Sequence, residues 1–105
     1  MTDLENTEWH GEVRPEGKPK YPIRLKFLGE GVAAFQVQHT ATGEWRSWFP
    51  TWEWSLCGQG VRFGAGPSLG GSHFIGTVYG QTIIAGGTST GARREMELSY
   101  FGVVE

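Results

Sequence analysis

Apolar and polar residues alternate with a period of two along most of this chain, which is the pattern of β-strands with one buried face. The alternation is cleanest in the segment YPIRLKFL. In residues 32–40 two registers compete, with either Phe35 or Ala34 facing inward. The expected strands span residues 6–14, 21–28, 32–40, 45–49 and 51–57 on either side of Pro50, 61–65, 73–79, 82–88 and 93–103.

Short stretches rich in glycine, proline and small polar residues separate these strands. The chain has 17 glycines in 105 residues, against a usual frequency of roughly 7%, and glycine suits tight turns far better than helices. We therefore expect an all-β fold with no helix longer than one turn. A single antiparallel meander of about eight strands that hides one apolar face closes most simply into a small up-and-down barrel. A rolled two-sheet sandwich is the alternative.

Length and composition narrow the class of protein. A chain of 105 residues forms one domain, in which residues 1–5 are expected to be a flexible tail. The net charge of −2 argues against duplex nucleic acid as a partner. The single cysteine excludes an internal disulfide. No signal peptide and no apolar run long enough to span a membrane are visible, so the expected location is the cytoplasm.

Four of the five tryptophans lie in the segment EWRSWFPTWEW, residues 44–54. Trp52 and Trp54 share one parity and are expected to line the inside of a strand. If that phase continues through Pro50, Trp48 and Arg46 face inward too. Arg46 would then anchor a carboxylate or enolate at the end of an aromatic wall. The alternative is that the indoles fill the barrel and Arg46 reaches solvent at its rim.

The same segment also predicts an apolar outer surface. Trp45, Trp48 and Phe49 cannot all point inward, so part of this surface lies outside the barrel or under a neighbouring chain. Large exposed aromatic residues often mark interfaces. A homodimer built on this segment is therefore one hypothesis.

Other residue types indicate no metal and no cofactor. His10, His39 and His73 lie on different expected strands without metal-ligand spacing. The stretch GAGPSLGG lacks the ending of a phosphate-binding loop and is expected to be a loop that can cover the barrel mouth. Arg93 and Arg94, followed by two glutamates, are expected to form a solvated strand face or local ion pairs.

Five segments carry a resemblance to a known type of protein: TEWHGEV, PIRLKFLGEG, TWEWSLCGQGVRF, HFIGTVYGQTIIAGGT and REMELSYF. Their turns and alternation resemble small bacterial lipocalin-like and avidin-like barrels, over most of the chain. The resemblance implies a binder of small hydrophobic or amphipathic ligands, although a few relatives in natural-product pathways act as cyclases. Biotin binding is not implied, because no set of polar ligand contacts transfers.

Three functions follow as hypotheses. The leading one is a non-enzymatic binder that holds a hydrophobic or aromatic ligand in a tryptophan-lined cavity. The second is a cofactor-free cyclase or isomerase, and the third is an interaction module that uses the tryptophan-rich segment. A binder of single-stranded nucleic acid ranks last. The expected ligand-binding residues are Trp9, Phe27, Arg46, Trp48, Trp52, Trp54, Phe74 and Tyr100. For an enzyme, the candidate hydrogen-bond or acid–base partners are Arg46, Glu53, His73 and Tyr79.

Overall fold

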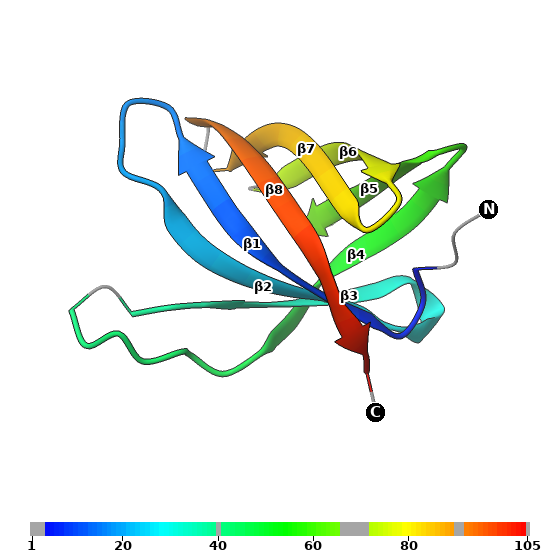
Figure 1. The fold of residues 1–105 in the computed structure, drawn as a ribbon, viewed down its shortest axis with the longest axis horizontal. Coiled ribbons are helices and arrows are strands. Elements are labelled where there is room, and N and C mark those ends of the chain that lie inside the picture. The colour runs from blue at the N-terminus through cyan, green and yellow to red at the C-terminus, as the bar shows by residue number, and fades with distance from the viewer. Residues whose placement is uncertain (1–3, 40, 66–71, 90–91, 105) are drawn as a thin grey trace.

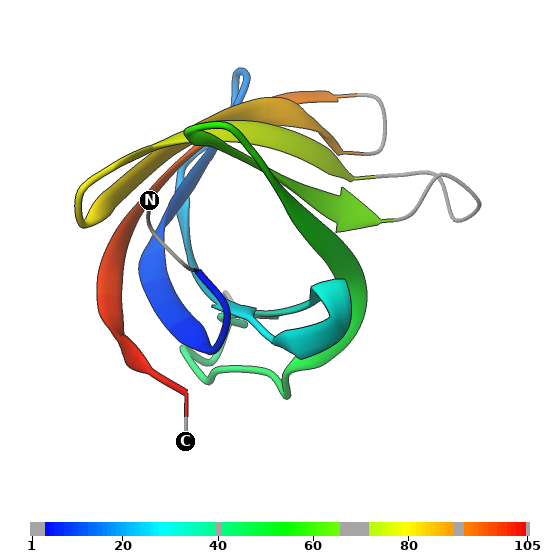
Figure 2. The same ribbon diagram turned by 90° about the vertical axis from the view of Figure 1, so that its right-hand side faces the viewer.

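The protein is a closed antiparallel β-barrel of eight strands in sequence order (Figures 1 and 2). It is known from a computed structural model, which describes residues 4–39, 41–65, 72–89 and 92–104. The barrel closes because β1 pairs with β8 as well as with β2. The fold class predicted from the alternation is thus confirmed. The strands are β1 (Thr7–Pro15), β2 (Tyr21–Phe27), β3 (Val32–Val37), β4 (Phe49–Cys57), β5 (Gly60–Ala65), β6 (His73–Tyr79), β7 (Thr82–Ser89) and β8 (Ala92–Val103).

The two ends of the barrel differ in the length of their connections. At one end, the turn end, β2 and β3 are joined through the short 3-10 turn η1 (Gly29–Gly31), and two-residue turns follow β4 and β6. Residues 4–6 and the end of β8 also lie there (Figure 2). At the other end, the loop end, β1, β3, β5 and β7 finish and longer connections such as residues 38–48 begin. We refer to the loop end as the mouth of the barrel.

The register of β3, which the alternation left open, is fixed by its neighbours. Phe35 pairs with Leu25, and Leu25 is fully buried inside the barrel. Phe35 packs against the core, whereas Ala34 pairs with the outward residue Lys26. Ala34 is nevertheless 2% exposed, so the outside of the barrel is covered at this point.

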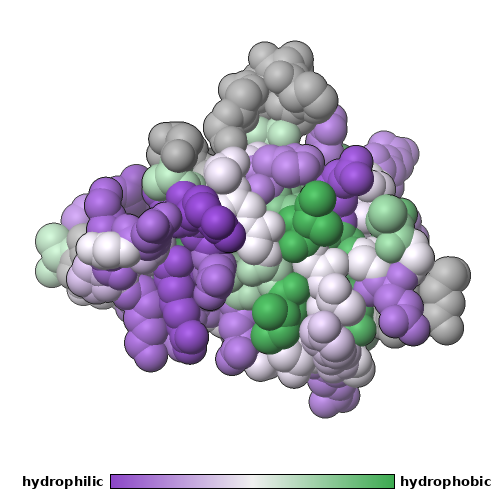
Figure 3. Space-filling view, turned by 90° about the horizontal axis from the view of Figure 1, so that it is seen from above, coloured by the Kyte–Doolittle hydropathy of each residue, from purple (hydrophilic) through white to green (hydrophobic). Residues whose placement is uncertain are grey.

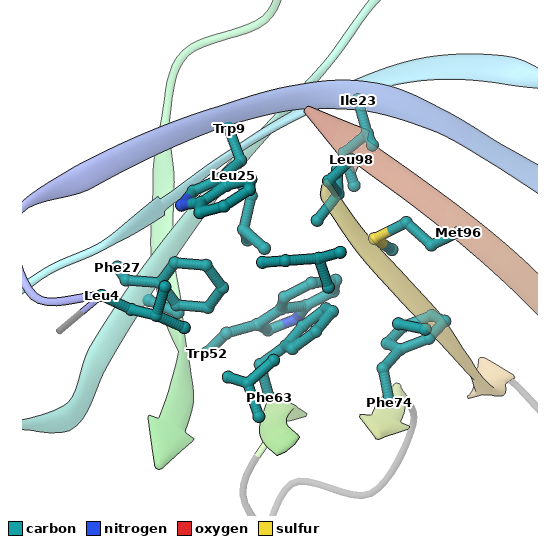
Figure 4. Packing of buried hydrophobic residues seen from close by; sticks show 14 of the residues in the cluster. Leu4, Trp9, Ile23, Leu25, Phe27, Trp52, Phe63, Phe74, Met96 and Leu98 are labelled. Carbon is teal, nitrogen blue, oxygen red and sulfur yellow. The ribbon is translucent and has the colours of Figure 1, made fainter. Parts of the chain in front are cut away.

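Aromatic side chains fill the barrel interior (Figure 4). Phe63 stacks on Phe74 with ring centroids 5.5 Å apart, and Phe27 meets Phe63 edge-on at 5.9 Å. In an eight-stranded barrel inward side chains are large enough to occupy the whole cross-section. The largest fully buried side chains are Trp9, Phe27, Phe63, Phe74, Leu4, Leu25, Ile83, Leu98, Val13 and Val61.

The segment before β1 belongs to this core. Leu4, within the expected tail of residues 1–5, is fully buried and lies beside Phe27 in Figure 4. The amide of Asn6 donates to the carbonyl of Phe27 at 2.6 Å, and the amide of Val104 donates to the carbonyl of Asn6 at 2.8 Å. Residues 4–6 thus close the turn end of the barrel.

Gly11 and Gly87 lie where a neighbouring backbone comes too close for a side chain. A Cβ atom on Gly11 would overlap the carbonyl oxygen of Glu97 on β8, and one on Gly87 would overlap that of His73 on β6. Glycine in a strand commonly marks such a close backbone approach. The high glycine content therefore serves the barrel wall as well as its turns.

Candidate functional site

The phase of the tryptophan-rich segment changes within β4. Ala33 pairs with Trp52 and Phe35 pairs with Phe49, so two residue steps on β3 match three on β4. Such an extra residue is a β-bulge, and it reverses the face to which every earlier side chain points. The phase of Trp52 therefore does not continue through Pro50, and Trp48 and Arg46 do not share its inner face.

Trp52 is an inner residue, as its parity predicts. Its ring stacks on Phe35 with centroids 4.3 Å apart and lies 5.8 Å from that of Phe74. Trp54 covers the core nearer the turn end, where it meets Phe27 edge-on at 5.2 Å. The indole Nε1 of Trp54 donates to the carbonyl of Leu28 at 2.8 Å, so the polar N–H group of this ring has a hydrogen-bond partner.

Trp45 and Trp48 lie outside the barrel, against the outer face of β2. The guanidinium carbon of Arg24 is 3.9 Å from the ring centroid of Trp45, and the ammonium of Lys26 is 4.1 Å from that of Trp48. These are cation–π contacts, and both indoles are half-buried. The Arg46 side chain is exposed. The barrel wall thus separates Arg46 and Trp48, the predicted ligand residues that precede Pro50, from the inner residue Trp52.

The remaining predicted ligand residues are spread along the interior. Phe74 is buried towards the loop end. Trp9 is buried towards the turn end, where its Nε1 donates to the hydroxyl of Thr7 at 2.9 Å. The rings of Trp9 and Tyr100 meet edge-on at 5.5 Å, and Tyr100 is 37% exposed. Among the predicted ligand residues, ring contacts join Trp52 with Phe74, Phe27 with Trp54, and Trp9 with Tyr100.

The four residues considered for acid–base chemistry do not converge. Glu53 and His73 lie in one outward row on either side of Gly64, which puts their backbones about 10 Å apart. Tyr79 is exposed at the far end of β6. Arg46 lies outside the barrel on the segment that precedes β4.

Arg94 is an inward-facing cation that the sequence interpretation missed. It alternates with the buried residues Met96 and Leu98 along β8, and it is half-buried, whereas Arg93 is exposed. Its Nη1 donates to the hydroxyl of Tyr21 at 2.6 Å. Its Nε is buried and has no hydrogen-bond partner among the described residues. Counting the parity back from Met96 would have placed Arg94 inside.

The surroundings of Arg94 place its cation at the mouth of the aromatic interior. Arg94 pairs with Gly87 on β7, and Gly87 pairs with Phe74 on β6, so a residue without a side chain separates the guanidinium from the phenyl ring. The strand spacing puts the backbones of Arg94 and Phe74 about 10 Å apart. An open recess of about 360 Å³ lies at this rim, lined by Arg14, Pro15, Glu16, Arg93, Arg94 and Glu95.

This arrangement suits an anion that carries an apolar group. A guanidinium that donates Nη1 to a hydroxyl keeps its Nε–Nη2 edge, which is the edge that pairs with a carboxylate or phosphate. A buried donor without a partner costs about 1–3 kcal/mol, so such groups call for a functional explanation. We define Arg94, Tyr21, Phe74, Trp52 and Phe35 as the mouth site.

The described residues hold no cluster of three or more histidine, cysteine, aspartate or glutamate side chains suited to a metal ion. His10 contacts Glu8 through Nε2 at 2.5 Å and stacks on Phe101. Cys57 is a free thiol on the surface. In the described part of the chain, no helix has the length and apolar character needed to cross a membrane.

Comparison of the chain with protein families, with curated proteins and with solved structures found no match. The likeness to lipocalin-like and avidin-like proteins is thus one of architecture: eight antiparallel strands in a single meander that closes on itself. A small barrel with a buried aromatic cluster is compatible with ligand binding.

Proposed function

We propose that this barrel binds a small hydrophobic or aromatic molecule bearing an anionic group, at the mouth site. The observation that carries the proposal is the buried Nε of Arg94, which has no partner among the described residues although it lies at the opening of an aromatic interior. A carboxylate on the Nε–Nη2 edge of Arg94 would complete the hydrogen bonds of this side chain.

The apolar part of the ligand would lie against the aromatic side chains nearest the loop end. Phe35 is half-buried and stacks on Trp52, which in turn lies beside Phe74. Planar groups stack on such rings with a modest gain beyond area burial. Phe27 and Phe63 are fully buried in contact with each other, so the ligand would occupy the mouth rather than the full length of the barrel.

The enzymatic alternative draws less support from the site. A cyclase or isomerase would need acid–base groups next to the bound substrate, and Glu53, His73 and Tyr79 are exposed outside the barrel. The interaction-module alternative would use Trp45 and Trp48. Each of these indoles is already covered on one face by a cation of its own chain.

The test is a comparison of acids with their neutral analogues. Binding of dodecanoate and 1-naphthoate, and of dodecan-1-ol and 1-naphthamide, is followed by tryptophan fluorescence and by calorimetry. The acids are expected to bind more tightly than the neutral partners. Loss of a charge-assisted hydrogen bond costs about 1.5–3 kcal/mol, so Arg94→Met is expected to weaken the acids about tenfold to a hundredfold.

Arg46→Met is the matched control, because it removes an exposed cation that lies outside the barrel and does not line the recess beside Arg94. It is expected to leave the affinity for the acids close to that of the parent. Equal affinity for acids and neutral analogues would contradict the role of Arg94. Absence of binding by all four compounds would count against a small hydrophobic anion as the ligand.

A further inference from the structure

The outward faces of β6 and β7 expose three large hydrophobic side chains between them. Ile75 is 54% exposed, Ile84 44% and Tyr79 63%, and no Asp, Glu, Lys or Arg lies among them. Figure 3 looks down on this side of the molecule, where strongly hydrophobic side chains lie among weakly polar ones. We call this surface the β6–β7 face; its outward residues are His73, Ile75, Thr77, Tyr79, Thr82, Ile84, Gly86 and Thr88.

The strand registers arrange this face and its two flanks into rows. One row runs from Arg62 on β5 through Ile75 and Gly86 to Glu95 on β8. Within this row the β5 end is basic and the β8 end is acidic, with Glu97 in the next row along β8. Two cations lie nearby: Arg93 of β8 beside Thr88, and Arg14 of β1 opposite Glu95. Opposite charges border an uncharged centre.

The central row also combines a protrusion with a hollow. Ile75 projects from β6, while its neighbour Gly86 has open space where a Cβ atom would stand. A recess of about 330 Å³ extends from Gly86 across β8 to Arg14 of β1, and Ile84 and Glu95 form part of its lining. The face therefore carries both halves of a self-complementary contact, side by side in one row.

We propose that the β6–β7 face binds the same face of a second copy of this chain, about a twofold axis that runs parallel to the strands between β6 and β7. Such an axis lays β6 of each copy over β7 of the other without a shift along the strands. Ile75 of each copy then enters the hollow over Gly86 of the other. Two-fold contacts of this kind use one patch twice and close on themselves.

The flanking charges select this axis. With the axis parallel to the strands, Arg62 of each copy faces Glu95 of the other, which gives two opposite-charge contacts. An axis across the strands would instead place Arg62 over Arg62 and Glu95 over Glu95. Juxtaposed like charges disfavour that orientation strongly.

The twist of packed sheets leaves these contacts within reach. Two aligned sheets cross at roughly 30°, and β5 and β8 lie about 7 Å from the axis at the usual strand spacing. The crossing therefore displaces the flanks by about 4 Å, a distance that a flexible arginine side chain spans. The proposal does not depend on the mouth site, because Arg94 faces the interior and the β6–β7 face lies outside.

Sedimentation equilibrium of the full chain over the micromolar range tests the proposal. The parent is expected to form a dimer, and Ile75→Lys is expected to be monomeric at the same concentrations. Ile75 is more than half exposed, so this change leaves no cavity, and circular dichroism verifies the fold. The matched control is Val103→Lys, at a residue that is 67% exposed on β8, and it is expected to remain dimeric.

Charge exchange tests the axis. Arg62→Glu and Glu95→Arg are each expected to lower the association constant about tenfold or more, and the double variant R62E/E95R is expected to recover most of the loss. A monomeric parent, or a dimer insensitive to Ile75→Lys, would overturn the proposal. So would a double variant weaker than both single ones, or a dimer that is lost in Trp48→Ser and retained in Ile75→Lys.

Discussion

Trp48 and Trp52, four residues apart, lie on opposite sides of the barrel wall. Trp48 rests under the ammonium of Lys26 outside, and Trp52 stacks on Phe35 inside. The extra residue between Phe49 and Trp52 is what separates them. The two indoles therefore contribute to the protein in different ways, although they belong to one short segment.

Their substitution is expected to affect stability unequally. Trp52→Ala would remove a buried ring from the core, which costs about 3–5 kcal/mol. Trp48→Ala would remove one half-buried ring and its cation–π contact, a loss of about 1 kcal/mol. Urea unfolding followed by circular dichroism measures both changes. Equal losses in the two variants would contradict the bulge within β4.

The guanidinium of Arg94 is expected to lower the free energy of unfolding rather than raise it. Arg94→Met keeps the apolar stem and removes the buried donor that lacks a partner, so the free energy of unfolding should stay equal or rise by up to about 1 kcal/mol. Tyr21→Phe removes the hydroxyl that accepts from Nη1 of Arg94. This change should lower the free energy of unfolding by about 1 kcal/mol. Thermal and urea unfolding distinguish the two outcomes. A marked loss of stability in Arg94→Met would mean that the guanidinium is a structural group.

Gly11→Ala is expected to destabilise the barrel severely. The new methyl group would overlap the carbonyl oxygen of Glu97, so the β1–β8 pair would have to separate, at a cost of about 3 kcal/mol or more. Gly102→Ala is the control, because nothing lies within 4 Å of a Cβ atom there. That change should be neutral or stabilising by about 0.4–1 kcal/mol. Similar melting temperatures for the two variants would refute the close approach.

Leu4→Ala tests whether the segment before β1 is part of the core. Leu4 is fully buried, and truncation of a buried leucine costs about 2–5 kcal/mol. Leu56→Ala, at a leucine that is 37% exposed, should cost less than about 1 kcal/mol. Denaturant midpoints of the two variants give the comparison. A negligible effect at Leu4 would return residues 4 and 5 to the status of a tail.

The fold could be predicted from the sequence because two independent signals agree. Period-two alternation marks the strands, and glycine-rich turns at short spacing leave room only for hairpins. Most observed strands begin and end within one or two residues of the expected positions. Residues 45–48 are an exception: β4 begins at Phe49, and Trp45 makes a single bridge to Gln38.

The arrangement of the candidate site was harder to predict, for physical reasons. A bulge inverts the facing of all residues beyond it, and its presence in β4 depends on how β3 pairs, which local alternation does not encode. In β3 itself, Ala33 and Ala34 are both small and both buried, so hydrophobicity could not choose a face. Arg94 was hidden by its neighbours, because a doublet of arginines followed by glutamates is typical of a solvated strand.

The joining of residues 4–6 to the end of β8 has a practical consequence. Since Val104 bonds to Asn6 at the turn end, while Arg94 and Tyr21 stand where β8 and β2 begin at the loop end, a surface linkage made at Val104 would point the mouth of the barrel into solution. Immobilised in this way on a sensor chip, the protein would present its guanidinium to passing analytes. Because the linkage and the mouth lie at opposite ends of the barrel, the protein could also be attached to a carrier with its mouth exposed.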